Sequence, residues 1–325
     1  MDQPTVALTP IRVLAHFEPT ESVLDTVAPE ADWLDIRWCA ADDDDTFYAE
    51  LPDAEVIWHV LRPVSGDDLR AAPRLRLVQK FGVGINTIDV DVATERGIAV
   101  ANMPGANAAS VAEGTVLLML AALRRLPQLD RATRAGRGWP TDPALGEHCR
   151  DIGGCTVGLI GYGSVGKLVA RIVAATGATV LHTSTRPDGL AGWRELPELL
   201  AEADVISLHV PLTPHTDGLL DRDALTLVKP GAVLVNTSRG QVVDETALVG
   251  ALSDGRLAAA GLDVFAVEPI PPGSPLLALD NVVLTPHVTW YTADTMRRYL
   301  AAAIDNCRRL RDRHALAQVV NQPTG

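Results

Sequence analysis

The chain has 325 residues, of which 47% are hydrophobic and 21% are charged, and its formal net charge is −13. This length and composition exclude a mainly disordered or fibrous protein, and they predict two globular domains. The excess of acidic residues disfavours a general role in binding nucleic acid, because an acidic surface repels phosphate groups.

The sequence also predicts a protein without membrane association. Its longest apolar stretch, residues 115–123, is far shorter than the ~20 residues that a membrane-spanning helix needs. The first residues, MDQPTVALTP, lack the basic and apolar regions of a signal peptide. The four cysteines are too far apart for a Cys-x-x-Cys pair, which predicts neither structural zinc nor disulfides. We therefore expect a cytoplasmic protein with no bound metal.

Short apolar runs alternate with polar connectors in the N-terminal part of the chain. Runs rich in β-branched and aliphatic residues predict strands, and the stretches between them predict helices. The predicted strands are 11–17, 56–61 and 75–81, and the predicted helices are 21–27 and 67–72. Strands that alternate with helices indicate a parallel sheet covered on both faces. The acidic run 42–45 lacks the Gly turn and closing Glu of a calcium loop, so we expect a solvated loop there.

The rest of the chain continues this alternation. A long helix is expected from Ala109 to about Arg125, and the Gly- and Pro-containing stretch 131–150 is expected to be an exposed loop. A second series begins at Cys155, with predicted strands 156–160, 179–182, 205–209, 232–236, 258–262 and 282–284. A last helix is expected from Thr292 to about Leu316. The chain is therefore predicted to be of the α/β class.

A glycine-rich loop, Gly161-Tyr-Gly-Ser-Val-Gly166, joins the first strand of the second series to a helix expected at 167–175. Gly161 permits the tight turn, Gly163 lets backbone amides approach a pyrophosphate, and Gly166 lets the helix lie close to the sheet. The helix N-terminus, with the amides of Ser164 and Val165, favours negatively charged phosphates. A glycine loop alone also fits an ordinary turn, but the strand before it and the helix after it favour dinucleotide binding.

The end of the next strand indicates which dinucleotide binds. An NAD-selective site carries Asp or Glu there to accept hydrogen bonds from the adenosine ribose. This chain has Ser184, Thr185 and Arg186 instead, and these side chains can donate to a 2′-phosphate. The segment therefore predicts a preference for NADP(H), with NAD(H) as a second cofactor. The alternative is that Arg186 is an ordinary solvated residue.

From about Leu75 to Thr292 the chain resembles the D-isomer-specific 2-hydroxyacid dehydrogenases, because several separated motifs occur in the order found in that family. They are Phe81-Gly-Val-Gly-Ile-Asn86, Asn102-Met-Pro-Gly-Ala-Asn107 with Ser110-Val-Ala-Glu113, the glycine loop, Val210-Pro-Leu-Thr-Pro-His-Thr216, Lys229-Pro-Gly-Ala-Val-Leu-Val-Asn-Thr-Ser-Arg-Gly240, Gly261-Leu-Asp-Val-Phe265 and Thr285-Pro-His287. Each motif alone can arise by chance, whereas all of them in sequence identify the family.

The resemblance implies a discontinuous architecture. A Rossmann-type dinucleotide-binding domain with a doubly wound parallel sheet, residues 104–287, is inserted into a smaller flavodoxin-like substrate domain formed by 1–103 and 288–325. The substrate is expected in a cleft at the carboxyl ends of the strands. The region 109–150 matches the part through which family members dimerise, which predicts a homodimer.

In that family an Arg, a Glu and a His perform the chemistry, and the motifs place them at Arg239, Glu268 and His287. Reduction of a 2-oxo acid needs a proton at the developing alkoxide, and a histidine suits this transfer. A carboxylate on the other ring nitrogen fixes the tautomer and stabilises the imidazolium, which is the role expected for Glu268. The guanidinium of Arg239 is expected to hold the substrate carboxylate and to polarise its carbonyl. Each residue alone also fits a structural role.

The resemblance implies further contacts with the ligands. The backbone amides of Val83 and Gly84 are expected to hold the substrate carboxylate from the other domain. Asp263 is similar to the residue that holds the nicotinamide carboxamide in the family. The remaining positions are expected to line the cofactor, although small and apolar residues at strand ends also serve packing: Val111, Val210, Pro211, Thr216 and Thr237.

Departures from the family pattern bear on the substrate. Trp290 and Tyr291 stand where many members have small residues, and they either line the pocket or pack between domains. The phosphite-oxidising branch has a Lys at the position of Val83, which disfavours phosphite as the substrate. Formate-oxidising relatives pair their histidine with Gln, so Glu268 disfavours formate.

These observations predict an NADPH-dependent oxidoreductase that reduces a small 2-oxo acid, such as glyoxylate, hydroxypyruvate or a larger analogue, to the D-2-hydroxy acid. The alternative is a dinucleotide-sensing, corepressor-like binding protein with little turnover, since one relative acts in this way and carries an aromatic pair after its histidine. Turnover of 2-oxo acids that is lost in His287→Ala distinguishes the two.

Overall fold

The computed structural model describes residues 10–137, 139, 143–187 and 189–323. The chain forms two compact units, one made of Met1–Asn107 with Thr292–Gly325 and the other of Ala108–Tyr291. The second unit is therefore inserted, along the chain, into the first. The domain boundaries expected from the sequence, after residues 103 and 287, differ from these unit boundaries by a few residues.

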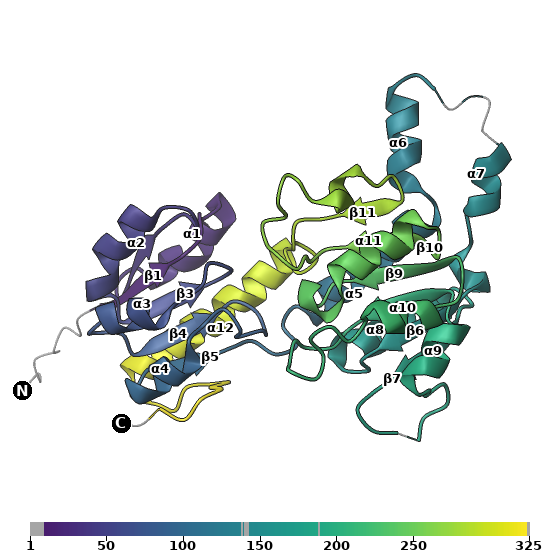
Figure 1. The fold of residues 1–325 in the computed structure, drawn as a ribbon. Coiled ribbons are helices and arrows are strands. Elements are labelled where there is room, and N and C mark those ends of the chain that lie inside the picture. The colour runs from purple at the N-terminus through teal and green to yellow at the C-terminus, as the bar shows by residue number, and fades with distance from the viewer. Residues whose placement is uncertain (1–9, 138, 140–142, 188, 324–325) are drawn as a thin grey trace, which may run out of the picture. The chain divides into compact units, whose positions relative to one another are not determined.

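The first unit contains a parallel five-stranded sheet in the order β2-β1-β3-β4-β5 (Figure 1). Its strands are β1 (Ile11–Ala15), β2 (Leu34–Trp38), β3 (Val56–His59), β4 (Leu77–Lys80) and β5 (Ala99–Ala101). The helices of this unit are α1 (Glu21–Val27), α2 (Asp44–Glu50), α3 (Gly66–Ala71), α4 (Val90–Glu95) and α12 (Ala293–Arg311). This strand order is that of flavodoxin-like folds.

The second unit contains a parallel six-stranded sheet in the order β11-β10-β9-β8-β6-β7. Its strands are β6 (Thr156–Ile160), β7 (Thr179–Thr183), β8 (Val205–Leu208), β9 (Ala232–Asn236), β10 (Leu257–Leu262) and β11 (Val282–Leu284). Its helices include α5 (Ala108–Leu123), α6 (Leu126–Arg134), α8 (Ser164–Ala175), α9 (Leu196–Glu202), α10 (Arg222–Leu227) and α11 (Glu245–Ser253). The strand order reverses between β6 and β8, which is where such sheets bind ligands.

Both faces of this second sheet are buried. Val233 and Val235 belong to the apolar core that includes residues of α5 and α8, whereas Leu234, between them, belongs to the core that includes residues of α9 and α11. Successive strand residues point to opposite faces, so a sheet covered on both sides needs continuous apolar runs. The fold class predicted from the sequence, a doubly wound parallel sheet with a flavodoxin-like second part, is confirmed.

Two predictions for connecting segments are wrong. The acidic run 42–45 is not simply a loop: Asp43 caps α2 by accepting a hydrogen bond from the Thr46 amide at 3.0 Å, and Asp44 begins the helix. Carboxylates are favourable in a first helical turn because they face its positive dipole end. The expected loop 131–150 contains the end of α6 (Leu126–Arg134) and all of α7 (Pro143–His148), while 138 and 140–142 lie outside the described residues.

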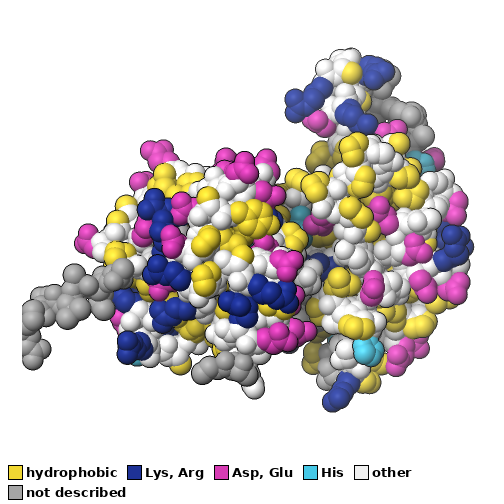
Figure 2. All heavy atoms as spheres, turned by 60° about the vertical axis from the view of Figure 1, so that its left-hand side comes forward, with side chains coloured by type: hydrophobic (Ala, Val, Ile, Leu, Met, Phe, Trp, Pro, Cys, Tyr) yellow, Lys and Arg dark blue, Asp and Glu magenta, His cyan; other side chains and the backbone are white. Residues whose placement is uncertain are grey.

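Five short 3-10 helices complete the elements of the described chain: Ala28–Glu30, Leu51–Asp53, Ile152–Gly154, Gly240–Val242 and Pro275–Ala278. None of the described helices is long and apolar enough to span a membrane. On the face shown in Figure 2, acidic and basic side chains are interspersed.

Candidate active site

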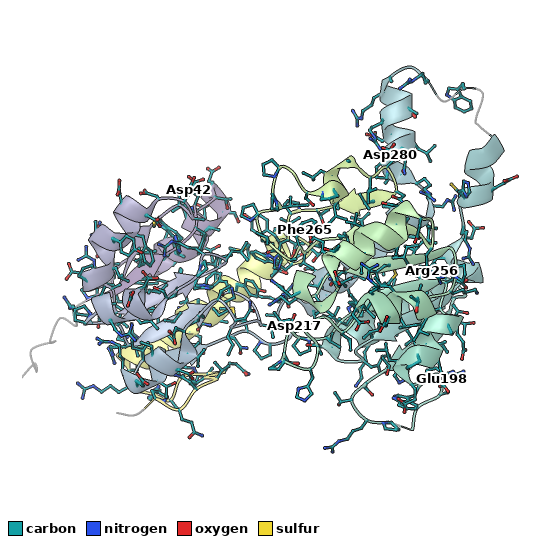
Figure 3. The ribbon with its side chains drawn as sticks, viewed as in Figure 1. Asp42, Glu198, Asp217, Arg256, Phe265 and Asp280 are labelled. Atoms are coloured by element: carbon teal, nitrogen blue, oxygen red, sulfur yellow. The ribbon has the colours of Figure 1, made fainter. Side chains whose placement is uncertain are left out.

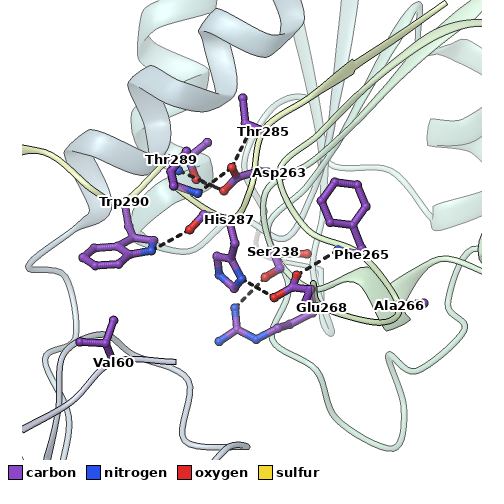
Figure 4. Close-up of polar contacts among 12 residues, drawn as sticks. Val60, Ser238, Asp263, Phe265, Ala266, Glu268, Thr285, His287, Thr289 and Trp290 are labelled. Atoms are coloured by element: carbon purple, nitrogen blue, oxygen red, sulfur yellow. Dashed lines mark hydrogen bonds and ion pairs between the residues drawn. The ribbon is translucent and has the colours of Figure 1, made fainter. Parts of the chain in front are cut away.

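His287 lies just after β11 with an unusual backbone conformation. Its φ is +56°, in the left-handed region that residues with a side chain rarely adopt. Its backbone N–H donates to the Asp263 carbonyl at 2.7 Å, and the Trp290 indole Nε1 donates to the His287 carbonyl at 2.9 Å. The ring Nδ1 lies 2.8 Å from Oε2 of Glu268 (Figure 4). The structure therefore brings two of the predicted catalytic residues into direct contact.

Glu268 occupies the loop after β10 and is held as a carboxylate. Its Oε1 accepts the Phe265 backbone N–H at 3.0 Å, and Phe265 is marked in this loop in Figure 3. Burial raises the pKa of Glu268, but the hydrogen bond and charge of His287, the Phe265 amide and the charge of Arg239 together lower it. An ionised Glu268 can only accept, so Nδ1 of His287 carries the hydrogen and Nε2 is left to exchange a proton with a ligand.

Arg239 follows β9 in a turn organised by a buried side-chain amide. Asn236 Oδ1 accepts from the Ser238 amide at 3.0 Å, and its Nδ2 donates to the Arg239 carbonyl at 2.8 Å. The guanidinium donates to the Ser238 carbonyl at 2.6 Å. Burial lowers the pKa of Arg239 and the Glu268 charge opposes this, so the side chain stays cationic beside the His287–Glu268 pair.

Gly240 holds the Arg239 turn against the loop that carries Glu268. A Cβ at position 240 would lie 1.9 Å from the Phe265 carbonyl carbon and 2.4 Å from the Ala266 nitrogen. These are backbone atoms and cannot yield as a flexible side chain would. The glycine is therefore required for the close approach of the two loops that carry Arg239 and Glu268.

The carboxylate of Asp263, at the end of β10, anchors the segment that carries His287. Asp263 is fully buried. Its Oδ1 accepts the Thr285 hydroxyl at 2.6 Å and the Val288 amide at 2.9 Å, and its Oδ2 accepts the Thr289 hydroxyl at 2.6 Å and amide at 3.1 Å (Figure 4). Thr285 belongs to the motif Thr285-Pro-His287, but neither its hydroxyl nor that of Thr289 was predicted to bind Asp263, because short hydroxyl side chains give no distinctive signal in the sequence. A role of Asp263 towards the nicotinamide carboxamide stays a prediction.

The glycine loop fits a dinucleotide. Gly161 has a φ of +101°, and a Cβ there would lie 2.6 Å from the His209 carbonyl oxygen. A Cβ at Gly166 would lie 2.3 Å from the Gly161 carbonyl oxygen, whereas a Cβ at Gly163 would meet no atom within 4 Å. Gly163 is the N-cap of α8, and no side chain caps that helix. The loop thus combines a tight turn, close packing and an open approach to helix amides, which is what a pyrophosphate requires.

The three residues predicted to select NADP(H) follow β7 in a turn. The Ser184 hydroxyl donates to the Arg186 carbonyl at 2.7 Å, and the Thr185 and Arg186 side chains are exposed. Beside this turn the Tyr162 ring stacks on the buried His182 imidazole, with centroids 3.9 Å apart. Ser184 is therefore engaged in shaping the turn, and the exposed Arg186 is available to an anionic ligand.

The other predicted contacts are placed as follows. The Thr216 hydroxyl donates to the Pro211 carbonyl at 2.6 Å in the loop that begins near Val210. The Thr237 and Thr115 hydroxyls lie 2.8 Å apart, and the Thr115 hydroxyl also donates to the Val111 carbonyl at 2.7 Å.

Val83 and Gly84 follow β4 in the first unit, where the side-chain amide of Asn102 donates to the Val83 carbonyl at 2.8 Å. Their contacts with cofactor or substrate stay predictions.

Comparison with known proteins identifies the family. The model of the D-isomer specific 2-hydroxyacid dehydrogenase NAD binding domain matches residues 116–289. A D-3-phosphoglycerate dehydrogenase of Mycobacterium tuberculosis is 42% identical over 84% of this chain and 52% of its own length. A glyoxylate reductase of Korarchaeum cryptofilum is 40% identical over 80% of this chain and 80% of its own.

Solved structures agree with this comparison. An NADPH-dependent glyoxylate/hydroxypyruvate reductase from Sinorhizobium meliloti, solved with NADP and malonate, has a TM-score of 0.82 and 30% identity over 97% of this chain and 98% of that one. The chain belongs to the D-isomer-specific 2-hydroxyacid dehydrogenase family, whose members bind a nicotinamide dinucleotide. It spans about half the length of the D-3-phosphoglycerate dehydrogenases that it matches.

Proposed function

We propose that this protein reduces a small 2-oxo acid to the D-2-hydroxy acid with NADPH as the hydride donor. The observation that carries the proposal is the 2.8 Å contact between His287 Nδ1 and Glu268 Oε2, beside the cationic Arg239. Together these side chains supply a proton donor, a carboxylate that stabilises its charged form and a cation for the substrate carboxylate.

The chemistry assigns one task to each side chain. The bound nicotinamide supplies a hydride to C2 of the substrate. As the C2=O π bond breaks, its electron pair moves to the oxygen, which takes a proton from His287 Nε2. Glu268 stabilises the imidazolium before the transfer and keeps the ring oriented. Arg239 and the amides of Val83 and Gly84 hold the substrate carboxylate.

The preference for NADPH is proposed from Ser184, Thr185 and Arg186, which replace the acidic residue of NAD-selective sites. The Sinorhizobium meliloti reductase is likewise described as NADPH-dependent. In Arg186→Ala we expect the KM for NADPH to rise about 10-fold, since a charge-assisted bond to the 2′-phosphate is lost, while the KM for NADH stays constant. A preference for NADH in the wild type, or an unchanged KM for NADPH in the variant, would contradict this part of the proposal.

We propose that the substrate is unphosphorylated, as glyoxylate and hydroxypyruvate are. Two cations near the carboxyl edge of the first sheet, Arg62 and Lys80, already have partners. Arg62 Nη2 lies 2.6 Å from Asp44 Oδ1, and its guanidinium lies over the Phe47 ring at 4.2 Å. The Lys80 ammonium donates to the Val60 carbonyl and lies 3.2 Å from His59 Nδ1. Neither group is available to a phosphate without losing these contacts.

A second candidate substrate pair is 3-phosphohydroxypyruvate and D-3-phosphoglycerate, which the 42% identity to D-3-phosphoglycerate dehydrogenases favours. Initial rates with glyoxylate, hydroxypyruvate, larger 2-oxo acids and 3-phosphohydroxypyruvate, each with NADPH and with NADH, separate the candidates. We expect the highest kcat/KM with an unphosphorylated acid and NADPH, and loss of turnover in His287→Ala. Tight dinucleotide binding without turnover of any acid would instead support the corepressor-like alternative.

We also propose that the protein forms a homodimer through about residues 109–150. Large apolar side chains are exposed on the helices of this region: Leu117 at 61% and Leu120 at 41% on α5, and Leu126 at 51% on α6. Leu117 and Leu120 are three residues apart on α5 and therefore share one face of that helix. A second copy of the chain would remove these side chains from water.

A further inference from the structure

We infer that Trp290 is a positioning residue, whose indole N–H fixes the backbone of His287 and thereby keeps the imidazole aimed at Glu268. The inference rests on the proposed function of His287 and adds a residue to that site. The indole Nε1 donates to the His287 carbonyl at 2.9 Å, and both residues belong to the same unit of the fold (Figure 4).

The backbone of His287 needs such support. At a φ of +56° the Cβ of an L-residue lies close to its own carbonyl, so this conformation persists only where neighbouring groups hold it. The N–H of His287 is held by the Asp263 carbonyl at 2.7 Å, and its carbonyl is held by the Trp290 indole. The amides of Val288 and Thr289 are bound by the Asp263 carboxylate. Trp290 thus supplies a side-chain donor to the carbonyl of His287.

The direction of the imidazole follows from this backbone. The φ and ψ angles of His287 set the direction of its Cα–Cβ bond, and that bond aims the ring at Glu268 Oε2, 2.8 Å from Nδ1. Because the following amides are held by Asp263, we expect a rotation of the peptide after His287 to be taken up by its Cα–Cβ bond, which would lengthen this contact and turn Nε2. The indole is itself held, because the Trp290 ring packs edge-on against the Tyr291 ring with centroids 5.1 Å apart. This role is independent of the two alternatives given for Trp290 above, pocket lining and packing between domains.

Two replacements of Trp290 separate the effect of its indole N–H from the effect of its ring. Trp290→Phe removes the donor and part of the ring, while site-specific exchange of Trp290 for 3-benzothienylalanine replaces the N–H by sulfur and keeps the ring shape. Trp33→Phe is the matched control, because the Trp33 indole also donates a hydrogen bond, to Glu30 Oε2 at 2.8 Å, but in the other unit. We expect both changes at position 290 to lower kcat about 10-fold, with unchanged NADPH affinity, and the control to keep the wild-type kcat.

A readout without turnover tests the same inference if no 2-oxo acid is reduced. The proton of His287 Nδ1 in its bond to Glu268 gives a low-field NMR resonance, identified by its absence in His287→Gln. We expect this resonance to shift or broaden in both Trp290 variants and to stay unchanged in Trp33→Phe. If the benzothienyl variant keeps the wild-type kcat and the wild-type resonance, the ring rather than the N–H matters and the inference is wrong.

Discussion

The pKa of Glu268 is set by opposing effects on a single side chain. Burial favours the neutral acid and raises the pKa, whereas the hydrogen bonds from His287 and the Phe265 amide, with the charges of His287 and Arg239, favour the carboxylate and lower it. The favourable contacts outweigh the burial, so the pKa is below its ordinary value. The contact with His287 that is proposed for catalysis therefore also makes the folding stability of the protein depend on pH through Glu268.

Glu268→Gln tests that link. A lowered pKa in the folded state stabilises the protein above the pKa of an unfolded glutamate, about 4.3, and this stabilisation is lost as the pH falls through the folded-state value. We expect the difference in unfolding free energy between wild type and Glu268→Gln to shrink below about pH 4 in urea titrations. At neutral pH we expect a kcat about 10²-fold lower. A constant difference across the pH range would contradict the assignment; Glu18→Gln, at an exposed position, is the control.

Gly240 provides a second prediction for a single residue. Gly240→Ala places a methyl group 1.9 Å from the Phe265 carbonyl carbon, so the loop that carries Glu268 must move. We expect a lower Tm and a loss of kcat together. Gly250→Ala in α11 is the control, because its methyl group meets nothing within 4 Å, and alanine in a helix is favoured over glycine by about 1 kcal/mol. An active, stable Gly240→Ala enzyme would show that the two loops do not depend on this close approach.

The glycines of the loop between β6 and α8 have different roles: some are required by the fold, and one leaves space for a ligand. Gly161 and Gly166 have backbone neighbours closer than a Cβ tolerates, and Gly163 has none. Substitution at Gly166 therefore acts on folding, and substitution at Gly163 acts on the space that a pyrophosphate would occupy.

This division predicts opposite outcomes for two alanine variants. In Gly163→Ala we expect a Tm near that of the wild type and a dissociation constant for NADPH raised about 10-fold, because the added methyl group enters the open approach to the α8 amides. In Gly166→Ala we expect a clear drop in Tm, since the methyl group would lie 2.3 Å from the Gly161 carbonyl oxygen. Thermal unfolding and a fluorescence titration measure the two effects. Equal Tm losses in both variants would contradict the division.

The strands of the second sheet were predictable from sequence, whereas the edge strands β2 and β5 of the first sheet were not. The bounds of β6 and β9 agree with the apolar runs, because both faces of these inner strands are covered and their side chains are almost all apolar. The bounds of the edge strand β11 also agree, since its three residues are all apolar. The edge strand β2, with the sequence LDIRW, has only one fully buried residue, and β5 has three residues, so neither produces a clear pattern. Local capping by Asp43 likewise turned an expected acidic loop into the start of α2.

The candidate site, too, could be predicted from the sequence only in part. The motifs indicated Arg239, Glu268 and His287, and the structure places His287 against Glu268 with the Arg239 charge acting on Glu268. The hydrogen bonds of Asp263 and Trp290 to the His287 segment depend on a left-handed backbone at a histidine, and no local pattern in the sequence indicates that conformation. Contacts of this kind arise from the packing of β10 and β11, so they become visible only in three dimensions.

Association of two copies is a prediction for the whole molecule. If the exposed face of α5 lies in a dimer interface, Leu117→Asp with Leu120→Asp places charges where water is excluded, and we expect the dimer to dissociate into monomers. Light scattering after size-exclusion chromatography measures the mass. Leu24→Asp, which alters an exposed leucine on α1, is the control and should keep the wild-type mass. A wild-type protein that is monomeric at micromolar concentration would contradict the proposed dimer.

The insertion of one unit into the other has a consequence for synthesis on the ribosome. Helix α12 packs against α1, its Asn306 amide donates to the buried Gln79 of β4 at 2.6 Å, and the Asn321 side chain bonds the Val100 amide of β5 at 2.8 Å. These contacts come from a segment that is translated after the inserted unit. The nascent N-terminal sheet therefore emerges with part of its apolar surface uncovered and waits while all of residues 108–291 are made. The strands of the inserted unit are contiguous in the chain, so we expect this unit to fold first, in the reverse of the order in which the two units begin.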